Sequence, residues 1–286
     1  MRTFYFTHFL VTSFCFLYMI RENPFLNYHH QISTMRETKS SQPGKLIKTE
    51  EVIYVSGQMS CHGFIAYDNN QKGRIPVVII VHEWWGLNDY AKSRAVQIAN
   101  LGYFAFVADL FGDGRTASNP DEARAFTKPY YSHPESTLQP IEAAIAKLAG
   151  FPNADTTRIA AMGYCFGGFV VVNAAKQGAP LKGVVSFHGR LVGLEPKKDI
   201  IKGKILICQG GDDEFVPIAD QAAFRKSMDS VGADYTFISY PGAKHAYTNP
   251  EATALGIKFK MPIAYNAPAD SASWQDMEKF FQTTLK

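Results

Sequence analysis

At 286 residues, 46% hydrophobic and 19% charged, the chain can form one large globular domain with a sizeable core. A formal net charge of +3 is too small to indicate nucleic-acid binding. Four widely spaced cysteines without a C-x-x-C pair exclude a dense disulfide framework and argue against a zinc site. A Cys61–Cys208 disulfide stays open, although the apolar strand pattern around Cys208 favours a buried thiol.

The first residues form a separate apolar segment. Residues 3–20 follow Arg2 and contain no acidic residue, Lys or Arg before Arg21. This pattern indicates an export signal or a short membrane anchor. The alternative is translation from Met35, which would give a cytoplasmic protein. We therefore separate residues 1–50, an apolar segment and linker, from a domain at residues 51–286, and expect membrane contact only through an anchor.

Strand and helix patterns alternate after residue 50. Residues 51–56 and 61–68 alternate apolar and polar side chains around Gly57, as an antiparallel pair does. Residues 74–83 and 103–111 are apolar runs typical of strands buried on both faces. The further expected elements are, in chain order, a helix capped by Asp89 and ending at Gly102, helices near 120–129 and 134–149, a strand at 158–165 running into a helix, strands at 181–189 and 204–213, a helix at 217–232, a strand at 234–242 and a helix at 271–285. This order predicts an α/β domain with a mainly parallel central sheet flanked by helices.

Reactive and polar residues cluster at the predicted strand ends, where open parallel sheets bind ligands. They are Glu83, Asp109, Cys165, His188, Asp213 and His245. Among them, His188 fits a hydrogen-bonded structural histidine better than a residue lining a pocket. Trp84 and Trp85 fit pocket walls or packing rather than nucleotide binding.

The stretch GYCFGG places Cys165 where a strand turns sharply into a helix. This is the arrangement of a nucleophile elbow. Side chains at Gly163 and Gly167 would collide with the neighbouring helix and strand. The following helix N-terminus favours a thiolate, and the backbone N–H of Phe166 can help to bind an oxyanion. We therefore interpret Cys165 as a nucleophile rather than a structural cysteine.

A thiol nucleophile needs a base, and the base needs an orienting acid. His245 lies in the loop after the last predicted strand, and Asp213 follows the strand before it. Asp212 is a competing acid, but Asp213 fits the spacing G-x-x-D-x-x-V-P. The order nucleophile, acid, histidine is that of α/β hydrolases. Glu83 ends a buried strand, where a charged carboxylate needs a partner. It could cap a helix or form an ion pair with Arg94 or Lys92. Alternatively, it lies near the thiol and tunes the protonation of that thiol.

The segments HEWWGLND, LGYFAFVADLFG, GYCFGG, GGDDEFVP and GAKHAY resemble the dienelactone hydrolase family over nearly the whole domain. The resemblance implies a Cys165–His245–Asp213 triad. It also implies that Glu83 holds the resting thiol and swings away to take its proton when substrate binds. The N–H of Trp84 would be a second oxyanion donor, and no metal or organic cofactor would be used. The implied reaction is hydrolysis of a small-molecule ester or lactone by a monomer.

The sequence departs from this family where a substrate carboxylate would bind. Enzymes that open dienelactones carry an arginine four residues after the catalytic histidine, and Asn249 stands there instead. Arg115 and Arg124 are other sources of a cation. Opening of a dienelactone to maleylacetate is thus one hypothesis beside general carboxylesterase, acyltransferase or peptidase activity. A non-catalytic member that binds a small acid is a further alternative.

Overall fold

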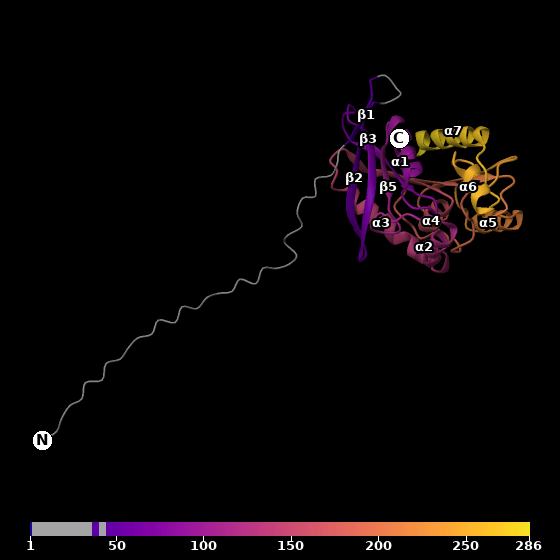
Figure 1. The fold of residues 1–286 in the computed structure, drawn as a ribbon, viewed down its shortest axis with the longest axis horizontal. Coiled ribbons are helices and arrows are strands. Elements are labelled where there is room, and N and C mark those ends of the chain that lie inside the picture. The colour runs from indigo at the N-terminus through magenta and orange to yellow at the C-terminus, as the bar shows by residue number, and fades with distance from the viewer. Residues whose placement is uncertain (2–35, 40–43) are drawn as a thin grey trace. The chain divides into compact units, whose positions relative to one another are not determined.

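We analysed a computed structural model, which describes residue 1, residues 36–39 and residues 44–286 (Figure 1). The apolar segment at residues 3–20 and the alternative start at Met35 lie outside the described residues. Within the described part, no helix is long and apolar enough to span a membrane.

Nine strands of the described residues form one sheet, in the order β1-β2-β3-β5-β4-β6-β7-β8-β9. Their bounds are β1 Arg36–Lys39, β2 Leu46–Ser56, β3 Met59–Asp68, β4 Ile75–Val81, β5 Phe104–Ala108, β6 Ala154–Tyr164, β7 Gly183–Phe187, β8 Lys204–Gly210 and β9 Tyr235–Tyr240. The pairs that join β1, β2, β3 and β5 are antiparallel, and every pair from β5 to β9 is parallel. The mainly parallel sheet predicted from the alternating pattern is confirmed.

Helices cover both faces of the sheet (Figure 1). Their bounds are α1 Asp89–Asn100, α2 Pro120–Ser132, α3 Leu138–Leu148, α4 Phe166–Lys176, α5 Ile218–Ser230, α6 Ala252–Phe259 and α7 Ala267–Thr284, with a 3-10 turn at Pro134–Thr137 before α3. Apolar side chains of α1 and α7 pack in one core, and those of α3, α4 and α5 pack in the other. Burial of apolar surface on both faces explains why β4 and β5 read as continuous apolar runs.

Three local features differ from the sequence-based expectation. The N-cap of α1 is Asn88, whose side chain accepts a hydrogen bond from the N–H of Ala91, and Asp89 is instead the first residue of the helix. Asparagine and aspartate are equally good caps, so composition could not separate these neighbours. Strand β1 and helix α6 were not predicted. Helix α6 is only eight residues long, which is too short for a clear apolar periodicity.

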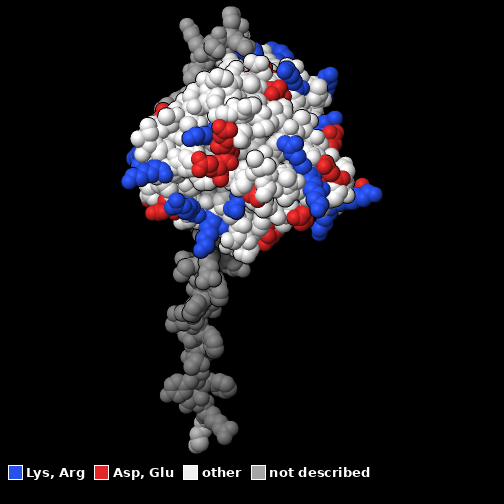
Figure 2. All heavy atoms as spheres, turned by 90° about the vertical axis from the view of Figure 1, so that its right-hand side faces the viewer, with Lys and Arg blue, Asp and Glu red and all other residues white. Residues whose placement is uncertain are grey.

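Surface charge is mixed on the side of the molecule that includes α5 and α6. Figure 2 shows basic and acidic side chains interspersed on this face, with broad uncharged areas between them. Such a surface agrees with the small formal net charge of +3.

Candidate active site

The turn between β6 and α4 holds Cys165 in an uncommon backbone conformation. Its φ of 52° and ψ of −113° lie outside the regions that non-glycine residues prefer. A Cβ at Gly163 would lie 2.1 Å from the carbonyl oxygen of Gly167, and a Cβ at Gly167 would lie 2.2 Å from that of Val81. Both glycines are therefore required by close approach of backbone, as the sequence predicted.

Three side chains from separate loops form a continuous line of polar contacts. Nε2 of His245 lies 3.0 Å from Sγ of Cys165, and Nδ1 of His245 lies 2.9 Å from Oδ2 of Asp213. Asp213 is fixed in turn by the side-chain amide of Gln209, which donates to Oδ2 at 2.7 Å. Asp212, the competing acid, is exposed, and Asp213 is buried. The structure thus brings together the thiol, the imidazole and the acid in the predicted order.

The surroundings of His245 favour its protonated form. Burial alone disfavours the charged imidazolium, but the neighbouring Cys165 and Asp213 raise the pKa of His245 well above its usual value. His245 is 8% exposed, so water screens these interactions little. An imidazolium flanked by a sulfur and a carboxylate can transfer a proton in either direction along this line.

Glu83 lies at the end of β4 and faces the same cavity as Cys165. Its Oε2 accepts a hydrogen bond of 2.6 Å from the side-chain amide of Asn249. The ion-pair partners considered from the sequence are engaged elsewhere, Lys92 with Glu51 at 2.8 Å and Arg94 with Asp270 at 2.6 Å. The ion pair considered as one alternative for Glu83 is therefore not formed with either residue.

Burial raises the pKa of Glu83 to about 7, and the hydrogen bond from Asn249 and the charges of His245 and Arg94 oppose this rise. A carboxyl group with this pKa can gain or lose a proton near neutral pH. In this structure the thiol contacts His245, and the carboxylate of Glu83 contacts Asn249.

Two residues near the thiol offer backbone N–H groups: Phe166 directly follows Cys165, and Trp84 lines the same cavity. Phe166 begins α4, so its N–H has no partner within the helix. The peptide before Trp84 is fixed by His82, a buried ring whose Nδ1 lies 2.6 Å from the carbonyl oxygen of Glu83. Nε2 of His82 accepts from the N–H of Leu110 at 3.3 Å, so the proton resides on Nδ1 and is donated to that carbonyl. The N–H of Trp84 is thereby held in a defined direction.

A cavity of about 730 Å³ opens over these groups. One side is apolar and includes Leu255 of α6 and the following Met261 and Ile263. The wall also carries three cations from α2 and from the loop after β7, namely Arg124, Lys128 and Arg190. The apolar side was not predicted from the sequence because helix α6 was not predicted.

The two arginines considered as carboxylate binders differ in position. Arg115 does not line the cavity: its guanidinium donates to the carbonyl oxygens of Phe111 and Gly112 and lies over the ring of Phe126. Arg124 does line it, but pairs with Asp121 at 2.6 Å. Arg190, which we did not predict, lies over the ring of Tyr131, another residue of the cavity wall.

Other predicted residues take structural positions. His188 is completely buried and outside the cavity lining, as expected for a hydrogen-bonded structural histidine. Cys61 and Cys208 are buried free thiols. Among the described residues, no group of three His, Cys, Asp or Glu side chains could hold a metal ion.

Comparison with known proteins places this chain in a family. The sequence pattern of the dienelactone hydrolase family matches residues 61–285. A Synechocystis protein named "Putative carboxymethylenebutenolidase" is 27% identical over 256 residues, which cover 84% of this chain and 98% of that protein. The crystal structure of a dienelactone hydrolase-like promiscuous phosphotriesterase from metagenomic libraries is 31% identical, with a TM-score of 0.77 over 84% of this chain and 99% of that chain.

A more distant solved structure shares the fold. Porphyromonas gingivalis dipeptidyl peptidase 4, at 13% identity and a TM-score of 0.62, shares the α/β-hydrolase fold over 83% of this chain and 35% of its own. The matched family and the mainly parallel sheet agree with the expectation from the sequence. The chain is a hydrolase of the α/β-hydrolase fold and belongs to the dienelactone hydrolase family.

Proposed function

We propose that this chain hydrolyses a small carboxylic ester or lactone with Cys165 as nucleophile, His245 as base and Asp213 as the orienting acid. The single observation that carries the proposal is the line from Sγ to Nε2 at 3.0 Å and from Nδ1 to Oδ2 at 2.9 Å. A nucleophile, a base and an orienting acid in this arrangement are what covalent acyl transfer requires.

The reaction follows from the positions of these groups. The thiolate of Cys165 attacks the acyl carbon, and the carbonyl oxygen becomes an oxyanion that accepts from the N–H groups of Trp84 and Phe166. Collapse of this intermediate breaks the carbon–oxygen bond, and the leaving alkoxide takes the proton of His245. A lactone opens at this step and stays attached as a thioester. His245 then takes a proton from water, the hydroxide attacks the thioester, and the acid leaves with regeneration of the thiolate.

Glu83 has a separate role in this proposal. Its pKa of about 7 allows it to accept the thiol proton at neutral pH and to leave the sulfur as thiolate. The contact with Asn249 keeps the protonated carboxyl group of Glu83 at the cavity wall after that transfer. This is the role that the family resemblance implied from the sequence.

The substrate class is broader than dienelactone itself. Asn249 is occupied with Glu83, so it does not replace the family arginine as a carboxylate ligand. The apolar side formed by Leu255, Met261 and Ile263 favours esters or lactones with a bulky apolar part. Opening of a dienelactone to maleylacetate remains the narrower proposal and would rely on Arg124 or Arg190 for the carboxylate.

The test is hydrolysis of p-nitrophenyl acetate and of a dienelactone by the full chain, beside Cys165→Ala. Loss of both activities in the variant supports the thiol mechanism and the lactone. Cysteine-dependent cleavage of the ester alone keeps the mechanism and removes the dienelactone. Transfer of the acyl group to an added alcohol or amine in preference to water would support an acyltransferase instead. Turnover that survives Cys165→Ala would overturn the proposed mechanism.

A further inference from the structure

A second histidine lies behind the nucleophile. His188 follows β7, is completely buried, and accepts a hydrogen bond from the backbone N–H of Cys165 at Nδ1, at 3.1 Å. A ring nitrogen that accepts carries no proton, so the proton of this ring resides on Nε2. Burial and the charges of His245 and Arg94 lower the pKa of His188 well below its usual value, which agrees with a neutral ring.

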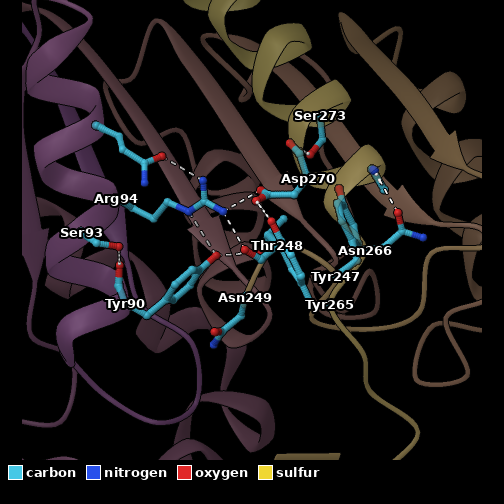
Figure 3. Close-up of polar contacts among 12 residues, drawn as sticks. Tyr90, Ser93, Arg94, Tyr247, Thr248, Asn249, Tyr265, Asn266, Asp270 and Ser273 are labelled. Carbon is cyan, nitrogen blue, oxygen red and sulfur yellow. Dashed lines mark hydrogen bonds and ion pairs between the residues drawn. The ribbon is translucent and has the colours of Figure 1, made fainter. Parts of the chain in front are cut away.

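The other nitrogen of this ring reaches the loop that carries the base. Nε2 of His188 lies 2.7 Å from Oγ1 of Thr248, which is therefore the acceptor. Thr248 stands three residues after His245 and directly before Asn249, the partner of Glu83. The hydroxyl of Tyr90 lies 2.7 Å from the same Oγ1 (Figure 3). The hydroxyl group of Thr248 thus connects the turn at Cys165, through His188, with helix α1, through Tyr90. Thr248 itself belongs to the loop that carries His245.

Arg94 of α1 also binds the loop that carries His245. Its guanidinium donates to the carbonyl oxygen of Thr248 at 2.6 Å and to Oδ1 of Asp270 at 2.6 Å (Figure 3). The Arg94 side chain is 6% exposed, so this ion pair is poorly screened. Residue Thr248 is consequently held at both its carbonyl oxygen and its hydroxyl.

The backbone explains why such support is needed. Cys165 and His188 both have positive φ, 52° and 41°, although neither is glycine. Such a conformation is strained and persists only where the surrounding structure holds it. The hydrogen bond between these two residues, together with that from the N–H of Cys165 to the carbonyl oxygen of Phe187 at 3.0 Å, provides this restraint.

We propose that His188 and Thr248 are positioning residues that set the distance between the thiol and the imidazole. They link the peptide of Cys165 to the loop of His245, so the 3.0 Å contact between Sγ and Nε2 is in place before substrate binds. Neither side chain lines the cavity. This inference rests on the proposed role of Cys165 as nucleophile.

The test compares Thr248→Val with Thr248→Ser in the full chain. Valine keeps the volume and removes the hydroxyl, and serine keeps the hydroxyl. We expect Thr248→Val to lower kcat for p-nitrophenyl acetate by on the order of 10- to 100-fold with a much smaller change in KM, because misplacement by about 1 Å reduces rate to this extent. Thr248→Ser should restore most of the wild-type kcat.

A matched control separates positioning from general loss of a buried hydrogen bond. Thr137 is also completely buried, and its hydroxyl donates to the carbonyl oxygen of Pro134 at 2.7 Å, outside the cavity lining. Thr137→Val should lower the melting temperature with kcat unchanged. An equal fall of kcat in Thr137→Val and Thr248→Val would overturn the proposal, as would wild-type kcat in Thr248→Val.

A second readout does not depend on turnover. The rate at which iodoacetamide alkylates Cys165, followed by peptide mass spectrometry over a pH series, reports the thiolate directly. We expect Thr248→Val to slow this alkylation near neutral pH, and Thr248→Ser to leave it close to wild type. If wild type shows no hydrolysis but this difference is present, the proposed function fails and the positioning role stands. An unchanged alkylation profile in Thr248→Val overturns the positioning role.

Discussion

Replacing Glu83 by glutamine should stabilise the chain by an amount that grows with pH. The ordinary pKa of a glutamate is 4.5, and burial raises that of Glu83 to about 7. Between these two values the folded state holds the proton and the unfolded state does not, so wild-type stability falls as the pH rises. The difference of about 2.5 pH units, at 1.36 kcal/mol each, corresponds to about 3 kcal/mol lost above pH 7.

Glutamine cannot ionise, and its side-chain oxygen can still accept the hydrogen bond from Asn249. Urea unfolding of the full chain, followed by far-ultraviolet circular dichroism, measures the free energy of unfolding at each pH. We expect Glu83→Gln to exceed wild type by about 3 kcal/mol near pH 8 and by little near pH 4.5. Glu142→Gln, at an exposed position of α3, is the matched control. A difference for Glu83→Gln that stays constant over this range would refute the reasoning.

Three further predictions concern the same site. Asn249→Ala removes a hydrogen bond that lowers the pKa of Glu83, so this pKa should rise further. In the same urea series, the fall of stability with pH should then extend to higher pH, and an unchanged pH profile would contradict this. Gly167→Ala places a Cβ 2.2 Å from the carbonyl oxygen of Val81 and should lower the melting temperature strongly, whereas an unchanged melting temperature would show that the backbone can yield. Leu255→Trp fills the apolar side of the cavity, so kcat/KM should fall roughly tenfold more for p-nitrophenyl hexanoate than for the acetate, and equal changes would place the acyl chain elsewhere.

The elbow and its partners were predictable because their signals are local. Cys165 lies between two glycines at the junction of an apolar strand and a helix, and backbone collision explains both glycines. His245 and Asp213 each follow a strand of the parallel sheet, and the carboxyl ends of such strands meet at one edge. Topology therefore brings these side chains near one another, whereas their catalytic roles stay a proposal.

The missed parts depend on contacts between distant residues. The partner of Arg94 is Asp270, 176 residues later, and the partner of Glu83 is Asn249, 166 residues later. No local pattern selects these pairs over the nearer charges that we considered. The eight-residue helix α6 is held by packing in a small apolar cluster with Ala246 and Ile263 rather than by a periodicity of its own. The apolar side of the cavity, which includes Leu255 of this helix, was not predicted for the same reason.

The most direct measurement is to trap the covalent intermediate. The full chain would be mixed with p-nitrophenyl acetate, quenched in acid during turnover, and digested for peptide mass spectrometry. We expect one acetyl group on the peptide that contains Cys165, and none on the corresponding peptide of Cys165→Ala, which should also lack turnover. Acetylation of another residue during turnover, or full turnover by Cys165→Ala, would contradict the claim that Cys165 is the nucleophile.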